Sequence, residues 1–141
     1  MDIRPARTDA EIRACFPVMR ELRPHLDEET FVAQVRRQMA NHGYVLAAAS
    51  ENGQVVAVTG FRIMEFLAWG RVLYVDDLVT VGSHRKSGCG SALMDWLEAE
   101  ARRLGCAQLH LDSGVHRHDA HRLYLGRKLD ITSHHFAKKL G

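Results

Sequence analysis

Val81-Gly82-Ser83-His84-Arg85-Lys86-Ser87-Gly88-Cys89-Gly90-Ser91-Ala92-Leu93 is the stretch of sequence that decides the fold. It follows a run rich in β-branched residues and leads into an amphipathic pattern, which predicts a loop between a strand and a helix. Two glycines remove the Cβ atoms that would keep a ligand away from the backbone, and the first amides of a helix have no intrahelical acceptor. Arg85 and Lys86 add positive charge. The stretch therefore predicts a phosphate-binding loop.

A simpler role for the two glycines stays open, because they can merely give the helix a flexible start. The known nucleotide motifs fit the loop less well. A Walker loop requires the pattern Gly-x-x-x-x-Gly-Lys-Ser/Thr, which the sequence lacks. A dinucleotide fingerprint requires a third glycine near position 93, where the chain has Leu93. The pattern thus favours a phosphate site of another kind.

Size and composition indicate one ordinary globular domain spanning residues 1–141. The net charge of +2 is too small to indicate a nucleic-acid partner. No apolar run approaches the roughly 20 residues of a membrane span, so we expect no membrane partner. The N-terminus lacks the apolar core of a signal peptide, and the three cysteines have no Cys-x-x-Cys spacing. These features predict a cytoplasmic protein.

Local signals in the first half predict two helices and a hairpin. Thr8-Asp9-Ala10-Glu11 has the form of a capping box and predicts a first helix, which Pro17 should kink or divide. A second helix should begin after Asp27 and end at Gly43. Two apolar runs joined by an Asn-Gly turn then predict antiparallel strands over Tyr44–Ser50 and Val55–Met64.

The second half predicts a strand, a crossover helix, a second strand, and a final helix and strand. The strands are expected over Arg71–Val81 and Ala107–Leu111, with a helix from about Gly90 to Leu104 between them. Asp119 or a neighbour should cap the last helix, and Ile131–Lys138 should form the last strand.

The Arg-x-x-Gly-x-Gly pattern of residues 85–90, together with this order of elements, resembles the GNAT N-acetyltransferase superfamily over nearly the whole chain. The resemblance implies an α/β fold of the GNAT type. Its sheet would be mixed and mostly antiparallel, with a splayed central parallel pair, and helices would flank it. Acetyl-CoA would be the cosubstrate. Homodimers are common in the family, so a homodimer is expected too, although no segment of the sequence marks an interface.

The resemblance also assigns the cofactor-binding residues. Leu78, Val79 and Val81 would meet the pantetheine arm beside the strand that precedes the loop. The loop would hold the pyrophosphate through its amides and its two basic side chains. Its residues are Arg85, Lys86, Ser87, Gly88, Cys89, Gly90 and Ser91.

Asp119-Ala120-His121-Arg122-Leu123-Tyr124 resembles the Ala-x-x-x-Tyr motif of the family's last helix, which makes Tyr124 the expected general acid. A phenol with a pKa near 10 can protonate a thiolate whose parent thiol has a pKa near 8.5. The alternative is a tyrosine that only packs its helix on the core. The family often has Asn where this chain has Arg117, and Gly-Phe where it has Lys128-Leu129, so the surroundings of this helix are expected to differ.

Asp76 and Asp77 are the expected bases, because an amine must lose a proton before it attacks a thioester. Their position resembles the Glu-Asp pair of diamine acetyltransferases. Side chains alternate along a strand, so only one acid should face the cleft unless a bulge intervenes. A solvated edge or a salt bridge is the alternative role for both acids.

The histidine-rich stretch offers a different hypothesis. His116, His118, Asp119 and His121 are plausible zinc ligands. Arg117 and Arg122 would repel a divalent cation, so we expect no metal.

The sequence therefore predicts an N-acetyltransferase that moves an acetyl group from acetyl-CoA to the amine of a small molecule by direct attack in a ternary complex. Two alternatives are an acyl-CoA-binding module without turnover and a histidine-metal hydrolase.

Overall fold

A computed structural model of the protein describes residues 1–85 and 87–141. The chain divides into two compact units, Met1–Leu111 and Asp112–Gly141, which are described separately below.

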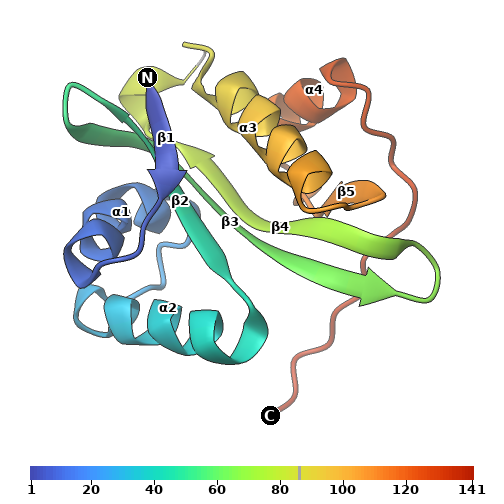
Figure 1. Cartoon of the computed structure of the whole chain (residues 1–141), viewed down its shortest axis with the longest axis horizontal. Helices are drawn as coiled ribbons and strands as arrows, with labels where there is room; N and C mark the ends of the chain where they lie inside the picture. The colour runs from blue at the N-terminus through green and yellow to red at the C-terminus, as the bar shows by residue number, and fades with distance from the viewer. Residues whose placement is uncertain (86) are drawn as a thin grey trace. The chain divides into compact units, whose positions relative to one another are not determined.

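A five-stranded sheet forms the centre of the first unit (Figure 1). Its strands lie in sequence order, and every neighbouring pair is antiparallel except the last, which is parallel. The expected mixed, mostly antiparallel sheet is thus confirmed. The strands are β1 (Asp2–Pro5), β2 (Val45–Glu51), β3 (Gln54–Phe66), β4 (Gly70–Thr80) and β5 (Gln108–Leu111).

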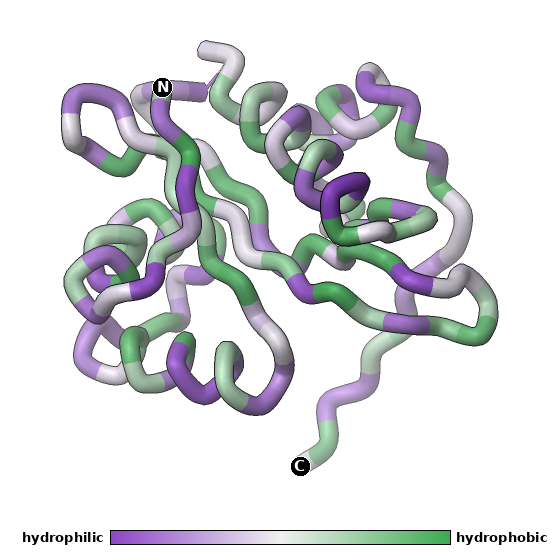
Figure 2. The backbone as a smooth tube through the Cα atoms, in the orientation of Figure 1, coloured by the Kyte–Doolittle hydropathy of each residue, from purple (hydrophilic) through white to green (hydrophobic). Residues whose placement is uncertain are grey.

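Helices cover both faces of this sheet. The helices α1 (Asp9–Leu22) and α2 (Glu28–His42) lie on one face, and α3 (Cys89–Arg103) lies on the other (Figure 1). Figure 2 shows hydrophobic and hydrophilic residues alternating along the turns of α1 and α2, as expected for helices with one buried side. The parallel strands β4 and β5 are joined through α3, which confirms the predicted crossover.

Local signals explain most of these boundaries. Thr8 and Glu11 form the predicted capping box of α1, and Asp27 caps α2 by accepting a hydrogen bond from the Glu29 amide. Asn52 and Gly53 both have positive φ angles, 51° and 76°, as a tight hairpin turn requires. The expectation for Pro17 was wrong in part, because α1 continues through it without division. A proline removes only one helical hydrogen bond, and the buried residues on both sides hold the helix together.

The face of the sheet under α1 and α2 carries one continuous hydrophobic core. Ile12, Phe16 and Phe31 from the helices pack in the same cluster as Val58 of β3 and Val79 of β4. On the opposite face, the ring of Phe61 packs edge-on against Trp96 of α3. These contacts establish which strand residues face which helices.

The strand β1 was not predicted. It pairs antiparallel with β2 at the edge of the sheet, and it is only four residues long. So short a segment, which ends in Pro5, has no room for a recognisable alternation.

The second unit contains one helix, α4 (His118–Gly126). Its N-cap is Arg117, which makes no side-chain capping bond, and Asp119 instead pairs with Arg122 at 2.7 Å. The predicted final strand is wrong: residues 131–138 are described, exposed and without secondary structure. Strand propensity alone does not make a strand, because each strand needs a neighbour to accept its backbone hydrogen bonds.

The end of α4 keeps a geometry that usually requires glycine. Lys128 has a φ of 65°, and the Leu129 amide donates to the Tyr124 carbonyl at 3.0 Å. Together with the Lys128 amide bond to the Leu125 carbonyl, these bonds form a Schellman motif. The helix therefore ends through a lysine in the left-handed conformation.

Candidate active site

A β-bulge in β4 shapes the centre of the candidate site. Opposite this point, Gly60 of β3 pairs with Asp77 and the next residue, Phe61, pairs with Val75. Asp76 is therefore an extra residue in β4, and the local alternation of side chains is interrupted.

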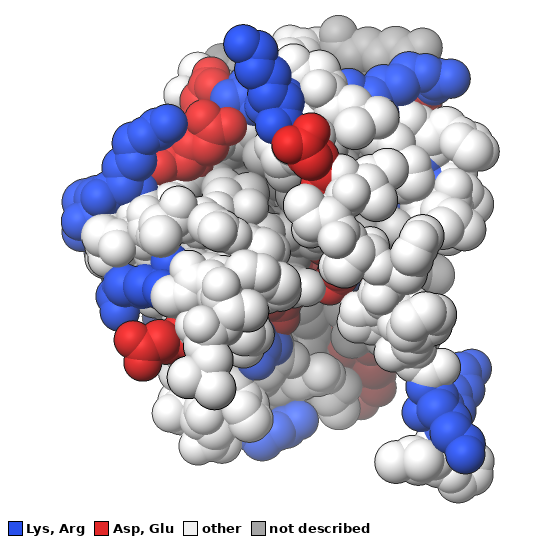
Figure 3. All heavy atoms as spheres, turned by 90° about the vertical axis from the view of Figure 1, so that its right-hand side faces the viewer, with Lys and Arg blue, Asp and Glu red and all other residues white. Residues whose placement is uncertain are grey.

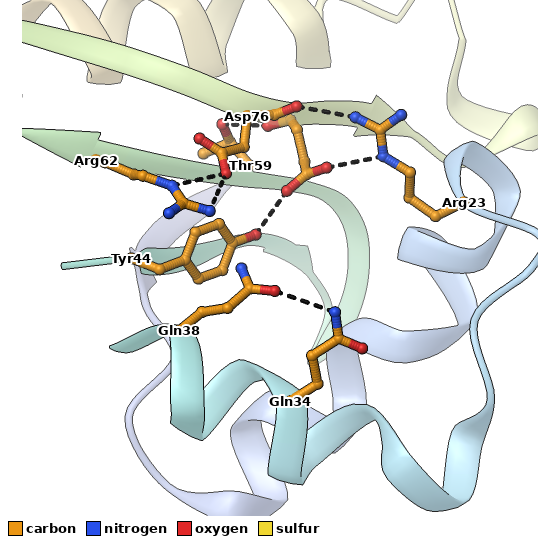
Figure 4. A network of polar contacts seen from close by, with 8 residues as sticks. Arg23, Gln34, Gln38, Tyr44, Thr59, Arg62 and Asp76 are labelled. Carbon is orange, nitrogen blue, oxygen red and sulfur yellow. Dashed lines mark hydrogen bonds and ion pairs between the residues drawn. The ribbon is translucent and has the colours of Figure 1, made fainter. Parts of the chain in front are cut away.

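The bulge turns both acids toward the same face of the sheet. Val75 pairs with Phe61, which faces α3, whereas Val79 belongs to the core beneath α1 and α2. Alternation outward from these two residues puts Asp76 and Asp77 both on the α1 side. Figure 4 shows Asp76 on that side, near Tyr44, whose hydroxyl contacts the carboxylate of Asp77. Two adjacent acids can share one face only where a strand bulges, and β4 meets this condition.

Asp77 joins three elements of the first unit. Its carboxylate accepts a hydrogen bond from Arg23 Nε at 2.9 Å and another from the Tyr44 hydroxyl at 2.8 Å. Arg23 is the C-cap of α1, and Tyr44 immediately precedes β2. The Asp77 backbone carbonyl also accepts from the buried Thr59 hydroxyl at 2.8 Å.

Asp76 has a different partner. Arg62 of β3 donates from Nε and Nη2 to the same oxygen, Asp76 Oδ2, at 2.8 and 2.6 Å. This carboxylate raises the pKa of the Arg62 guanidinium, which also lies 5.6 Å from the centre of the Tyr44 ring. The salt-bridge role that the sequence left open for the acids is thus present at both, and their catalytic role stays a prediction.

Tyr44 is the buried aromatic residue of this cluster. Burial is the main reason that its pKa is well above the usual value of 10, and the negative charge of Asp77 adds to the effect. Its hydroxyl therefore stays protonated and acts as a hydrogen-bond donor to Asp77.

The strand β4 extends from this cluster toward the cofactor loop. It pairs with β5 only over Val72–Val75, so within the described residues the segment from Asp77 to Thr80 is paired with β3 alone. Leu78 and Val79 are buried in this segment, and Val81 follows it half-buried. This is the stretch of strand that the resemblance assigns to pantetheine.

The loop after β4 ends at the N-terminus of α3. A short 3-10 helix spans Gly82–His84, and α3 begins at Cys89 with Gly88 as its N-cap. Gly88 has a φ of 89°, which glycine adopts without strain, and a Cβ atom there would meet no described residue within 4 Å. Among the described residues no side chain caps α3, and its first turn contains no acid. The amides of residues 89–91 are therefore available to an anion.

Acidic residues from neighbouring elements hold this loop. Glu21 of α1 accepts a hydrogen bond from the Gly82 amide at 3.1 Å and lies 3.5 Å from Arg85 Nη2. His84 lies 3.3 Å from Glu51 at the end of β2. Ser87 contacts both the His84 carbonyl and the Cys89 sulfur. Lys86, the other expected phosphate ligand, lies outside the described residues.

Tyr124 belongs to the second unit, where it is the buried residue of α4. Burial raises its pKa above the usual value of 10, and the nearby positive charge of Arg117 partly offsets this increase. The hydroxyl therefore keeps its proton near neutral pH, as a general acid must. Its proposed role stays a prediction.

The histidine-rich stretch is also in the second unit. His121 Nε2 contacts the Gly114 carbonyl at 2.8 Å, and Asp119 is paired with Arg122. The rings of His118 and His121 are 6.2 Å apart. Among residues 1–85 and 87–141, no group of three histidine, cysteine or acidic side chains is placed to hold a metal ion.

Arg23, Tyr44 and Arg62, the residues that hold the acid pair, were not predicted from the sequence. One signal was present, because a glycine inside a strand often marks the close approach of another group. That glycine is Gly60, and Tyr44 lies against it.

Surface charge and helix length add little to this description of the candidate site. On the face drawn in Figure 3, lysines and arginines lie in separate groups interspersed with neutral and acidic residues. Within the described part of the chain, each helix is too short or too polar to cross a membrane.

Curated proteins provide two informative relatives. The N-acetyltransferase YhdJ of Bacillus subtilis is 35% identical over 124 residues, which cover 87% of each chain. The aminoalkylphosphonate N-acetyltransferase of Salmonella typhimurium is 26% identical over 140 residues, which cover 99% of this chain and 91% of the relative.

A solved structure and a family model agree with these relatives. The aminoglycoside N-acetyltransferase AAC(6')-Iy, solved in complex with CoA, superposes with a TM-score of 0.85 at 12% identity, covering 99% of this chain and 93% of the other. At that identity the likeness is one of fold. The model of the acetyltransferase (GNAT) family matches residues 7–129. The chain therefore belongs to the GNAT acetyltransferase family.

Proposed function

We propose that this protein transfers the acetyl group of acetyl-CoA to a primary amine of a small molecule, by direct attack in a ternary complex. One observation carries the proposal: a bulge in β4 presents two carboxylates, and the loop after the same strand leads to the N-terminus of α3, where the first turn contains no acid. An acid pair suits an ammonium group, and the helix start suits a pyrophosphate. Family membership supports the reaction class.

The residues of the cofactor loop fit acetyl-CoA. The amides of residues 89–91 and the side chain of Arg85 would hold the pyrophosphate, and Leu78, Val79 and Val81 would line the pantetheine arm. The open space at Gly88 and the absence of an acid in the first turn of α3 support this assignment. Lys86 is assigned to the phosphates on the sequence motif alone. The CoA complex of the related aminoglycoside N-acetyltransferase supports the choice of cofactor.

The acid-base roles follow from the chemistry of the groups. Asp76 and Asp77 would attract and deprotonate the acceptor amine, and Tyr124 would protonate the departing thiolate. The raised pKa of Tyr124 supports its role as a proton donor. Relatives named for aminoalkylphosphonates and aminoglycosides support a small amine as the acceptor.

The test is to follow free thiol from acetyl-CoA with and without an amine. The panel contains an aminoalkylphosphonate, an aminoglycoside and a diamine. Thiol release that requires an amine supports the transferase. Release without any amine indicates a hydrolase, and thermal stabilisation by acetyl-CoA without release indicates a binding module.

Three expectations stay predictions of the sequence: one domain over residues 1–141, a homodimer and a cytoplasmic location. Sedimentation of the purified chain tests the homodimer, and fractionation of the source cells tests the location.

A further inference from the structure

The two adjacent acids of the β4 bulge are held in different ways, and the difference points to different roles. We propose that Asp76 is the catalytic residue, which receives the acceptor's ammonium group and takes its proton. Asp77 is a positioning residue that fixes the bulge. This inference rests on the proposed function, which gave both acids the same role. It assigns removal of the amine proton to Asp76 and support of the bulge to Asp77.

Both oxygens of Asp77 are occupied. Oδ1 accepts from Arg23 Nε at 2.9 Å, and Oδ2 accepts from the Tyr44 hydroxyl at 2.8 Å. Only 14% of the side chain is exposed. A substrate ammonium would have to share each of these oxygens with a donor from α1 or with the donor that precedes β2. Asp77 is therefore suited to joining those elements to the bulge.

Asp76 has one occupied oxygen and one open oxygen. Both hydrogen bonds from Arg62 end on Oδ2, and within residues 1–85 and 87–141 the other oxygen, Oδ1, accepts none. The side chain is 23% exposed, more than that of Asp77. An ammonium group needs an acceptor with free lone pairs, and Oδ1 of Asp76 provides one.

Arg62 and Arg23 support this division by fixing the bulge from two sides. Arg62 holds Asp76 from the neighbouring strand while its guanidinium lies over the Tyr44 ring. Arg23 donates from Nη2 to the Asp76 backbone carbonyl at 2.9 Å as well as to the Asp77 side chain. The position of Asp76 Oδ1 therefore depends on the contacts of Asp77.

The reaction balances with this assignment. The acceptor arrives as an ammonium ion, and one proton moves from its nitrogen to Asp76 Oδ1 and then to water. The nitrogen lone pair forms a bond to the thioester carbonyl carbon, and the carbon–sulfur bond breaks with its electron pair on sulfur. The thiolate takes a proton from the general acid, and the second nitrogen proton restores that acid through solvent. The products are an N-acetyl amide, CoA thiol and one proton.

The test compares Asp76→Asn, Asp77→Asn and a control, Glu65→Gln, in the full chain. Glu65 is an exposed acid of β3, so its variant loses one negative charge away from the bulge. Each variant is measured for melting temperature, for the thermal shift on adding acetyl-CoA, and for amine kinetics across pH 6 to 10.

Asp76→Asn should keep the acetyl-CoA shift, and its melting temperature should fall less than that of Asp77→Asn. Both hydrogen bonds from Arg62 end on one oxygen, which an asparagine amide can still supply, whereas Asp77 uses both of its oxygens. The kcat/KM of Asp76→Asn for the amine should fall by about 10² to 10⁴ and recover in part as pH rises, because the free amine becomes more abundant. Asp77→Asn should melt lower by about 5 °C or more, since Arg23 loses its charged partner. Its folded fraction should keep the pH profile of the wild type, with a smaller loss of kcat/KM than Asp76→Asn.

Reversed kinetic effects of the two variants, or equal melting temperatures, overturn the division of roles. A wild type that shows neither amine-dependent thiol release nor an acetyl-CoA shift overturns the proposed function and the role of Asp76 with it. The melting temperatures still judge the role of Asp77 in that case, because they do not depend on turnover.

Discussion

The hydroxyl of Tyr44 lies where a side chain of residue 60 would have to be. A Cβ atom on Gly60 would lie 1.8 Å from Tyr44 Oη and 2.3 Å from the ring carbon that carries it. Gly60 pairs with Asp77 across the sheet, so its missing side chain gives Tyr44 access to the bulge. The glycine is therefore required by packing; its φ angle lies outside the left-handed region.

Gly60→Ala should destabilise the protein by about 1 to 3 kcal/mol, because the methyl group must displace the buried Tyr44 side chain. Urea unfolding measures the loss. In a Tyr44→Ala background the same substitution should cost little, since the obstructing ring is gone. Equal costs in the two backgrounds would show that the contact between residues 44 and 60 is not the cause.

The cofactor loop is tested by a pair of substitutions at Gly88. Gly88→Asn and Gly88→Asp add side chains of nearly equal size in open space and share the strain of a left-handed backbone. Only the aspartate repels a pyrophosphate. Acetyl-CoA at a hundredfold excess over Kd should stabilise the asparagine variant by about 2.7 kcal/mol and the aspartate variant far less. Equal thermal shifts would place the phosphates elsewhere.

Glu21 contacts groups of the loop that the proposed phosphate would use. It contacts the Gly82 amide and approaches Arg85 at 3.5 Å. Glu21→Gln should lower the Kd for acetyl-CoA by roughly two- to fivefold, which corresponds to an exposed ion pair of up to about 1 kcal/mol. Calorimetry measures this change, with Glu65→Gln as the control for net charge. Weaker binding in Glu21→Gln would instead mean that the carboxylate supports the loop.

Tyr124→Phe should lower kcat by about 10² to 10⁴ if the phenol protonates the thiolate. The phenylalanine ring keeps the packing of α4, so the melting temperature and the acetyl-CoA shift should change little. The measurement requires conditions in which chemistry limits turnover. A wild-type kcat in this variant would assign the proton to solvent or to another group.

Two buried weak acids make stability depend on alkaline pH. Burial raises the pKa of the Cys15 thiol from 9.0 to about 12, and the pKa of Tyr44 is raised well above 10. Both groups ionise first in the unfolded chain, so their contribution is complete below about pH 9 and is lost as pH rises. The free energy of unfolding should fall by up to about 1.4 kcal/mol per pH unit for each ionising group.

Urea unfolding at pH 8 to 11 checks this dependence. Cys15→Ala should flatten the decline that begins near pH 9, and Tyr44→Phe should flatten the part above pH 10, although both variants start from lower stability. Slopes that match the wild type would mean that other groups cause the alkaline loss.

Most of the fold could be predicted because its signals are local. The capping box at Thr8, the Asp27 cap and the Asn52-Gly53 turn each act within a few residues, and each is present in the structure. The strand expected over residues 131–138 failed because a strand depends on a partner far away in the sequence.

In the candidate site, too, the features that could be predicted are those marked by local sequence. The loop motif and the adjacent acids were visible in the sequence. The contacts of Arg23 and Tyr44 with Asp77 join residues 54 and 33 positions apart, and no local pattern announces them. Arg62 meets Asp76 through the register of β3 against β4, which depends on the bulge itself.

The bulge amounts to one residue inserted into β4. The strand residues on either side of it face the same sides of the sheet as they would in a regular strand without the insertion. If one of the two acids were deleted, Val75 would still face α3 and Val79 would still face the core under α1, because regular alternation would be restored between them. The site could therefore gain or lose a carboxylate through a single-codon change without refolding the sheet. We expect aligned relatives that lack the paired acids to show a one-residue gap at position 76 or 77.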